Sequence, residues 1–256
     1  MDAEIKLARK LPEPIRKVAR AGKDVARFSV AYKKNREFKR RYRESKGPRD
    51  YFALAVDAFG LVQKPPEMLG FIELVMQESP KTFCEIGTFN GGTTFLLSQA
   101  LGSVDTTIGV DLHIRNATLL RYLKRPGQHL NLIRGSSYAP PTVARVERLL
   151  GGRQLDMLFI DGDHEYAGVS ADFFAYRPMV REGGIIAFHD IVLDHMSRFG
   201  RPTTSWAGGV PAFWSQLKDL LWSHEFIEDS EQDGYGIGVL RNRVDVVIDK
   251  SHFAAA

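Results

Sequence analysis

From residue 81 to about residue 191, short apolar runs alternate with segments in which apolar residues recur at helical spacing. The last two runs are almost continuous, as in parallel strands that are buried on both faces. The predicted strands cover residues 82–86, 107–111, 130–134, 155–161 and 184–189. The helices between them are predicted over residues 93–100, 116–123, 141–150 and 166–180. This alternation predicts an α/β fold with a doubly wound, mostly parallel sheet.

Helical patterns also precede the predicted sheet. They cover residues 1–47, 50–59 and 67–77. The pair Gly47-Pro48 marks a boundary, because neither residue favours continuation of a helix. We predict two parts of the chain: a basic helical N-terminal extension, residues 1–60, and a domain, residues 61–256, that contains the sheet.

The region after the last parallel strand is less regular. Residues 193–209 form a polar stretch that is long for a plain connection, which favours a functional lid. Residues 211–222 are predicted to form a helix. Residues 225–227 and 235–240 are predicted to form two final strands, joined by an acidic turn.

Positive charge is concentrated at the start of the chain. The protein has 256 residues and a net charge of +4, but residues 1–50 hold 17 Lys and Arg against 7 Asp and Glu. The basic stretch at residues 33–43 could attract nucleic acid or anionic lipid. The alternative is an amphipathic helical arm that packs on the body or on a second subunit. We favour the arm, because no RNA-binding motif accompanies the charge.

The composition indicates the cellular setting. Apolar residues make up 44% of the chain, which is ordinary for a globular protein with a sizeable core. The single cysteine, Cys84, lies in the first predicted strand and excludes a disulfide within the chain, which favours a reducing compartment. No apolar run approaches the roughly 20 residues of a membrane span, and no signal peptide is recognisable. We expect a soluble, cytoplasmic protein.

The first strand leads into a glycine turn and then a helix, in the sequence KTFCEIGTFNGG over residues 81–92. A strand, glycine turn and helix let the backbone approach a nucleotide-like ligand closely. Asp111 ends the second strand and could accept hydrogen bonds from both hydroxyls of a ribose, as in NAD and S-adenosylmethionine sites. The turn lacks the GxGxxG pattern of a pyrophosphate cradle, and Glu85 would repel a pyrophosphate. A carboxylate there suits a cationic ligand such as S-adenosylmethionine.

The carboxyl ends of parallel strands meet at one edge of a sheet, where ligands bind. In this chain those ends are unusually polar. They carry Glu85 and Gly87, Asp111, Ser136 and Ser137, Asp161, Asp163 and His164, and His189 and Asp190. So many polar groups at strand ends favour an enzyme over a structural protein.

Three motifs carry a family resemblance: EIGxxxGG[ST] at the first strand, FIDGDH at the fourth, and GGxIxxHD at the fifth. With them the sequence resembles the class I S-adenosylmethionine-dependent methyltransferases and their Rossmann-like fold. More narrowly, it is similar to the metal-dependent O-methyltransferases that include catechol O-methyltransferase. Within those it looks most like the macrolide deoxysugar, rhamnosyl and mycobacterial methylmannose enzymes. The resemblance covers residues 81–191 well and 205–240 loosely, and does not cover residues 1–60.

The resemblance implies a divalent cation, usually Mg²⁺, held by Asp161, His189 and Asp190. His189 departs from the family pattern, in which this position is an oxygen ligand, and Mg²⁺ does not favour imidazole. The cation is therefore expected on Asp161 and Asp190, or is a softer ion such as Mn²⁺. Asp161 and His164 are the implied catalytic residues, with His164 as general base because an imidazole titrates near neutral pH.

The resemblance also implies which residues hold S-adenosylmethionine. Glu85 and Gly87 would face its methionine moiety, with Gly91 and Thr93 in the turn beside it. Asp111 would bind the ribose. Ser137 would lie near the adenine, and Asp163 would contact the cofactor's amino group.

The predicted function is methyl transfer to a hydroxyl of a sugar or saccharide by residues 61–256, the S-adenosylmethionine-binding domain. A catechol-like acceptor is one alternative, and a metal-dependent relative of the cephalosporin hydroxylase type is another. A nucleic-acid-binding protein that uses the basic arm is an alternative of a different class. A homodimer formed through the N-terminal helices is a further expectation.

Overall fold

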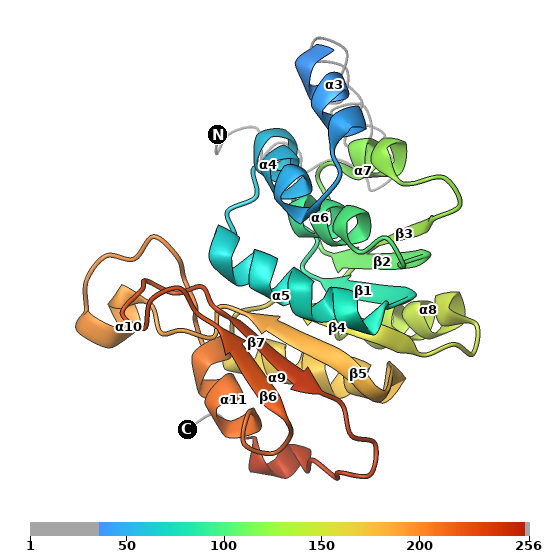
Figure 1. Ribbon diagram of the computed structural model, residues 1–256. Helices are drawn as coiled ribbons and strands as arrows, with labels where there is room; N and C mark the ends of the chain where they lie inside the picture. The colour runs from blue at the N-terminus through green and yellow to red at the C-terminus, as the bar shows by residue number, and fades with distance from the viewer. Residues whose placement is uncertain (1–35, 254–256) are drawn as a thin grey trace, which may run out of the picture.

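The computed structural model describes residues 36–253. Their centre is one seven-stranded sheet with the strand order β3-β2-β1-β4-β5-β7-β6 (Figure 1). The strands are β1 (Thr82–Ile86), β2 (Thr106–Asp111), β3 (His129–Arg134), β4 (Leu155–Ile160), β5 (Val180–His189), β6 (Ser223–Phe226) and β7 (Ile237–Arg241). The first five strands are parallel, whereas β7 runs antiparallel to β5 and β6 antiparallel to β7. The predicted doubly wound, mostly parallel sheet is confirmed.

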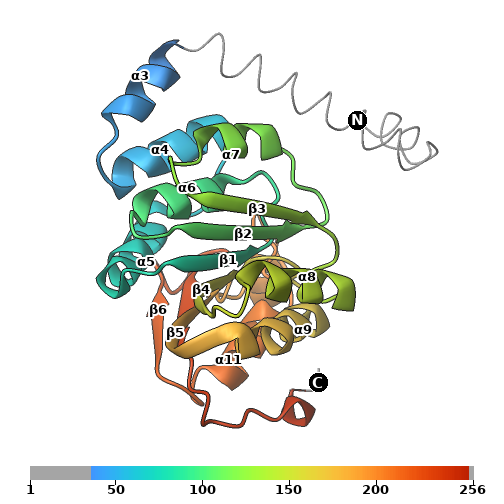
Figure 2. The same cartoon turned by 90° about the vertical axis from the view of Figure 1, so that its right-hand side faces the viewer.

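Helices cover both faces of the sheet (Figures 1 and 2). Their bounds are α3 (Arg36–Glu44), α4 (Pro48–Phe59), α5 (Pro65–Glu78), α6 (Gly92–Ala100), α7 (Ala117–Leu123), α8 (Pro140–Leu150), α9 (Tyr166–Tyr176), α10 (His195–Phe199) and α11 (Val210–Leu217). Side chains alternate along a strand, so Phe83 and Phe159 pack with α3 to α7, while Cys84 and Leu158 pack with α8, α9 and α11. Two apolar cores thus enclose the sheet, and they leave the carboxyl ends of its strands for a site.

Several predicted boundaries are wrong. The helix expected over residues 166–180 ends at Tyr176 and is followed by a 3₁₀ turn, Arg177–Met179, because Pro178 cannot continue an α-helix. Strand β5 begins already at Val180. The helix expected to reach residue 222 ends at Leu217, and β6 begins at Ser223.

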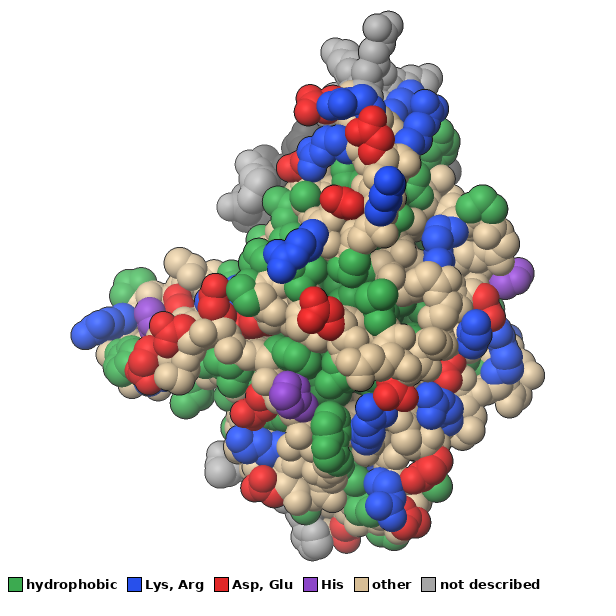
Figure 3. Space-filling view, viewed as in Figure 1, with side chains coloured by type: hydrophobic (Ala, Val, Ile, Leu, Met, Phe, Trp, Pro, Cys, Tyr) green, Lys and Arg blue, Asp and Glu red, His purple; other side chains and the backbone are tan. Residues whose placement is uncertain are grey.

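The basic helix α3 packs on the body through its aromatic side. Phe38 is buried, and the Tyr42 hydroxyl donates a hydrogen bond of 2.8 Å to the carbonyl of Leu123. Lys and Arg side chains gather on the outer surface around α3 (Figure 3), and one of them, Arg41, pairs with Asp57. The remainder of the predicted N-terminal helices, residues 1–35, lies outside the described residues. The division of the chain at residue 60 stays a prediction.

Within residues 36–253 we find no helix long and apolar enough to cross a membrane.

Candidate active site

The glycine turn after β1 presses against the end of β4. Gly87 has a φ of +95°, and a Cβ at that position would lie 1.7 Å from the carbonyl oxygen of Asp161. The backbone N–H of Asp161 donates a hydrogen bond of 2.8 Å to the carbonyl of Ile86. Only glycine fits both the conformation and the space. The turn therefore brings the motifs that follow β1 and β4 into direct contact.

Gly91 and Thr93 lie at the start of α6 and are packed against other residues. Gly91 has a φ of +87°, and its Cβ position lies 2.6 Å from Leu120. Thr93 is buried. Their predicted contacts with a cofactor stay predictions, and both are placed here by the packing of α6.

Glu85 lies beneath the site. Its side chain is fully buried, Oε2 accepts a hydrogen bond from the Thr94 hydroxyl, and Oε1 has no hydrogen-bond partner among the described residues. Burial raises the pKa of Glu85 to about 8. From the sequence we expect an anion at Glu85, whereas burial keeps its carboxyl group mostly protonated at pH 7.

A cavity of about 520 Å³ opens at the carboxyl ends of β1 to β4. It is lined by Ile86, Gly87, Val110, Asp111, Leu112, Gly135, Ser136, Ser137, Tyr138, Gly162, Asp163, His164 and Trp206. Gly87, Asp111, Ser137 and Asp163 all belong to the predicted cofactor set. The structure thus brings these four together, and leaves Glu85, Gly91 and Thr93 outside the cavity wall.

Asp111 and Asp163 are held in place by hydrogen bonds. Asp111 accepts from the backbone N–H groups of Phe89 (2.8 Å) and His113 (2.5 Å). Asp163 accepts from the Tyr138 hydroxyl (3.2 Å) and from the backbone N–H of Glu165 (3.1 Å). Because each carboxylate oxygen has two lone pairs, both residues can still accept bonds from a ligand.

Beside the cavity, two aspartates and two histidines form a compact cluster. His164 Nε2 lies 3.6 Å from Asp161 Oδ1 and 3.5 Å from Asp190 Oδ2. His189 Nδ1 lies 3.3 Å from Asp161 Oδ1 and 3.0 Å from Asp190 Oδ2. One ligand atom each from Asp161, His164 and Asp190 lie within 4.8 Å of one another, close enough to hold a metal ion together. The predicted catalytic and metal residues therefore converge, and we call these four residues the Asp/His cluster.

Mutual attraction sets the protonation of the Asp/His cluster. Burial opposes ionisation of Asp161, but the charge of His189 and contacts with both imidazoles hold the pKa of Asp161 below its usual range. Burial alone would lower the pKa of His164, yet interaction with Asp161 and the charge of Asp190 raise it to about 9. The pKa of His189 is raised for the same reason, against the effect of burial. Without a cation, both imidazoles are therefore the counter-ions of the two carboxylates.

Residues far away in the sequence complete the Asp/His cluster. Gln63, between α4 and α5, donates from Nε2 to Asp161 Oδ2 (3.2 Å). Asp190 Oδ1 accepts from the Tyr235 backbone N–H (3.0 Å) and lies 3.3 Å from the Ser205 hydroxyl. His164 Nδ1 lies 2.6 Å from the carbonyl of Trp206, and the two rings stack. No local pattern could have found Gln63, Ser205 or the role of Tyr235.

Asp172 on α9 is a second residue that sequence reasoning missed. It is fully buried, and neither of its carboxyl oxygens has a hydrogen-bond partner in the described part of the chain. A Cβ built on Gly162, which lines the cavity, would lie 3.4 Å from Asp172 Oδ2. Burial raises the pKa of Asp172 to about 7. The floor of the cavity thus rests on a buried carboxyl group.

The donor set of the Asp/His cluster decides which cations suit it. The carboxylates of Asp161 and Asp190 suit Mg²⁺, which prefers oxygen ligands. The imidazoles of His164 and His189 suit softer ions such as Mn²⁺. Both nitrogens of His189 lack a hydrogen bond of good geometry within residues 36–253, although Nδ1 lies at ion-pair distance from both aspartates. The residues therefore fit a divalent cation that is held mainly by the two carboxylates.

One family model and one curated protein match parts of this chain. A family model described as a methyltransferase domain matches residues 84–191. An uncharacterized protein of Acanthamoeba polyphaga mimivirus is 33% identical over 117 residues, which cover 43% of this chain and 51% of that protein. The chain thus matches about half the length of this curated relative.

Solved O-methyltransferases share the fold. One is from Bacillus cereus, in complex with SAH, with a TM-score of 0.55 and 16% identity over 76% of this chain and 90% of that chain. Another is TomG from Streptomyces achromogenes, involved in tomaymycin synthesis, in complex with SAM. It has a TM-score of 0.56 and 17% identity over 78% of this chain and 91% of that chain. These two solved structures show that the chain shares their fold.

Proposed function

We propose that this protein is an S-adenosylmethionine-dependent O-methyltransferase that methylates a hydroxyl of a sugar or saccharide. The observation that carries the proposal is the Asp/His cluster on the rim of the 520 Å³ cavity. His164 belongs to both, so a cofactor in the cavity would lie beside the cluster. This arrangement supports a transfer reaction between two bound molecules.

Asp111, Ser137 and Asp163 are the residues that we propose to bind the cofactor. Asp111 keeps lone pairs for ribose hydroxyls while its backbone hydrogen bonds fix its position. Ser137 and Asp163 lie along the same wall. Gly87 lets the ligand approach the backbone at the end of β1. Glu85 lies beneath the cavity and would affect cofactor binding indirectly, through the position of the glycine turn.

Asp161 and Asp190 would hold a divalent cation. When bound, such a cation lowers the pKa of a coordinated hydroxyl and offsets the carboxylate charges. Asp161 is oriented for this by Gln63, and Asp190 by Tyr235 and the hydroxyl of Ser205.

His164 is the group that we propose to take the proton of the acceptor hydroxyl at Nε2. Its Nδ1 is engaged with the carbonyl of Trp206, which favours the tautomer with the proton on Nδ1 and leaves Nε2 free as a base. The carboxylates that raise the pKa of His164 to about 9 must have their charge offset before the imidazole is neutral at pH 7.

The two histidines favour a second candidate. A cluster with two imidazoles also suits iron, as in metal-dependent relatives that do not transfer a methyl group. The two candidate functions differ in their cofactor. Only the O-methyltransferase requires S-adenosylmethionine as the source of the transferred group.

Calorimetric titration tests the cofactor. We expect micromolar affinity for S-adenosylmethionine and S-adenosylhomocysteine, with and without Mg²⁺, and no binding of NAD. Methyl transfer from labelled S-adenosylmethionine to a panel of glycosides should then disappear on chelation and in Asp190→Ala, while Asp190→Ala still binds S-adenosylhomocysteine. Full activity of Asp190→Ala in chelator would contradict the proposed role of a cation. If none of the three compounds binds, the proposed methyltransferase function is wrong.

A further inference from the structure

A second hollow lies next to the Asp/His cluster, between the start of α5 and the turn that joins β6 to β7. It has a volume of about 790 Å³ and is lined by Lys64, Thr204, Glu228, Asp229, Ser230, Gln232, Asp233 and Tyr235. We call it the polar groove. The backbone N–H of Tyr235 donates to Asp190 Oδ1, and Lys64 directly follows Gln63, which contacts Asp161. The polar groove therefore adjoins the Asp/His cluster through Tyr235 and through Gln63 next to Lys64.

The floor of the polar groove is held by buried polar contacts. Glu67 on α5 is 2% exposed and accepts hydrogen bonds from the backbone of Glu228 (3.2 Å), the amide of Gln232 (2.7 Å) and the backbone of Gly236 (2.9 Å). A carboxylate that is buried with three donors fixes the turn in one conformation. The groove is thus shaped before any ligand enters.

Its opposite wall is held in the same way. Asp233 accepts from the backbone N–H groups of His195 (2.7 Å) and Thr204 (2.8 Å) and from the hydroxyl of Thr203 (2.6 Å). These contacts tie the turn to the segment that follows β5. In the same segment, Ser205 contacts Asp190 and Trp206 contacts His164. The segment therefore lines both the cavity and the polar groove.

Unusual backbone conformations meet where the polar groove joins the cluster. Asp190 has a φ of +62° and Tyr235 a φ of +61°, a region that residues other than glycine rarely adopt. The two are joined by the hydrogen bond from Tyr235 N–H to Asp190. Strain of this kind persists where the surrounding structure enforces it, often at functional sites.

The lining of the polar groove indicates what it would bind. Among its lining residues none is aliphatic, and the ring of Tyr235 is the one aromatic surface. That ring lies 5.9 Å from the ring of His189 and 5.8 Å from Lys64 Nζ, so it spans the cluster and the groove. A ring face beside carboxylate and amide acceptors suits the apolar face and the hydroxyl donors of a sugar.

The charges of the lining residues further restrict which ligands the polar groove can bind. Lys64, the one cation of the lining, is paired with Glu228 at 2.8 Å. Asp229 and Asp233 then leave the groove with an excess of negative charge. Asp229 accepts a backbone hydrogen bond on Oδ1, which leaves Oδ2 available. A phosphate group would meet like charges there, whereas a neutral or amino-bearing ligand would not.

We propose that the polar groove binds the methyl acceptor, and that it selects a polyhydroxylated molecule that is uncharged or amino-bearing over one that carries phosphate. The proposal rests on the proposed function, because it assigns the second substrate of the same reaction. Tyr235 would position a sugar ring next to the cluster, and Asp229 would favour an amino group.

Three derivatives of one sugar test the charge selection: methyl glucoside, glucosamine and glucose 6-phosphate. We expect saturation-transfer NMR on the full chain, loaded with S-adenosylhomocysteine and Mg²⁺, to show binding of the first two. Glucose 6-phosphate should bind at least tenfold more weakly. Equal or tighter binding of glucose 6-phosphate, or no binding of methyl glucoside and glucosamine, would overturn the proposal.

Variants locate the site. Asp229→Asn should weaken glucosamine by at least threefold and leave methyl glucoside unchanged, while the exposed control Asp245→Asn changes neither. Tyr235→Phe keeps the ring and should bind both sugars, whereas Tyr235→Ala should lose both and still bind S-adenosylhomocysteine. Identical sugar binding in Asp229→Asn and in the original protein would overturn the assignment. A protein that binds no S-adenosylhomocysteine would instead contradict the proposed function.

Discussion

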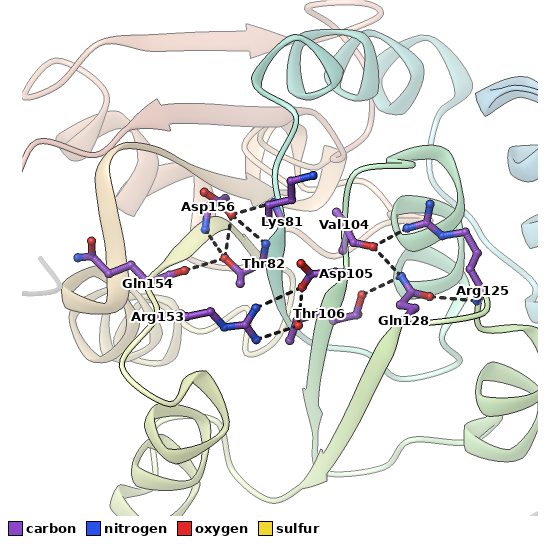
Figure 4. A network of polar contacts seen from close by, with 11 residues as sticks. Lys81, Thr82, Val104, Asp105, Thr106, Arg125, Gln128, Arg153, Gln154 and Asp156 are labelled. Carbon is purple, nitrogen blue, oxygen red and sulfur yellow. Dashed lines mark hydrogen bonds and ion pairs between the residues drawn. The ribbon is translucent and has the colours of Figure 1, made fainter.

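The two ends of the parallel strands differ in how their polar side chains are paired. At the amino ends of β1, β2 and β4, polar side chains form a connected network (Figure 4). Asp156 accepts from the backbone N–H groups of Lys81 (2.8 Å) and Thr82 (2.9 Å), from the Thr82 hydroxyl (3.0 Å) and from Arg181 Nε (2.7 Å). Both of its carboxylate oxygens thus accept hydrogen bonds.

At the carboxyl ends, buried polar atoms lack partners. Gln63 Oε1, Glu85 Oε1, Thr88 Oγ1, both oxygens of Asp172 and Nε2 of His189 make no hydrogen bond within the described chain. The amino-end network leaves one such atom, Arg125 Nε. Buried groups without partners cost stability, so their concentration at one end needs a reason. We infer that the amino end stabilises the fold, whereas the carboxyl end is kept ready for ligands at the expense of stability.

The largest expected effect comes from making the same substitution at the two ends of β4. Asp161→Asn should weaken Mn²⁺ binding by at least about 100-fold, because it removes a charged ligand. Asp156→Asn should leave Mn²⁺ affinity unchanged. Electron paramagnetic resonance of free Mn²⁺ measures both.

The free energy of unfolding should be affected more by Asp156→Asn than by Asp161→Asn, the reverse of the order for Mn²⁺ affinity. Asp156→Asn replaces an acceptor of four hydrogen bonds and should lower the free energy of unfolding by about 2–3 kcal/mol, measured by urea denaturation. Asp161→Asn should lower it less. Equal effects of the two substitutions in both assays would remove the distinction between the two ends.

Two glycines with positive φ give the next contrast. Gly87→Ala would force a Cβ to within 1.7 Å of the Asp161 carbonyl and should destabilise the protein by more than about 3 kcal/mol. Gly151→Ala, at the end of α8 on the amino side, meets no atom within 4 Å and should cost only about 1 kcal/mol. Thermal denaturation of both variants measures the two losses of stability. A small loss for Gly87→Ala would mean that the turn can move away from β4.

The smallest effect depends on pH. The pKa of Asp172 is about 7 in the folded protein, above its value in the unfolded chain, so the folded state retains a proton that the unfolded state loses between about pH 4 and pH 7. Stability therefore falls as the pH rises through that range. Asp172→Asn removes this loss and should raise the free energy of unfolding by about 1–3 kcal/mol at pH 8 and by little at pH 3.5.

Urea denaturation at the two pH values measures the difference. Asp156→Asn provides the comparison at the other end of the sheet, and it should destabilise the protein at pH 8. A gain for Asp172→Asn that is equal at both pH values would mean that the pKa of Asp172 is the same in the folded and unfolded states.

Local pattern was enough for most of the fold and for the centre of the site. The apolar runs predicted the five parallel strands, and these strands share an edge at their carboxyl ends. That rule alone predicts that Asp161, His164, His189 and Asp190 lie close together, as they do. The same pattern misjudged the ends of α9 and α11, because helical periodicity continues into residues that the chain uses for a turn.

Only the tertiary structure decided the rest. Gln63 and Tyr235 reach the Asp/His cluster from 98 and 45 residues away from their partners Asp161 and Asp190, and no periodicity connects them. The protonation of Glu85 and Asp172 depends on how completely the sheet and helices bury them, which the sequence does not display. Strands and their polar ends follow from short-range alternation, whereas contacts, burial and charge at the site arise when segments distant in the chain pack together.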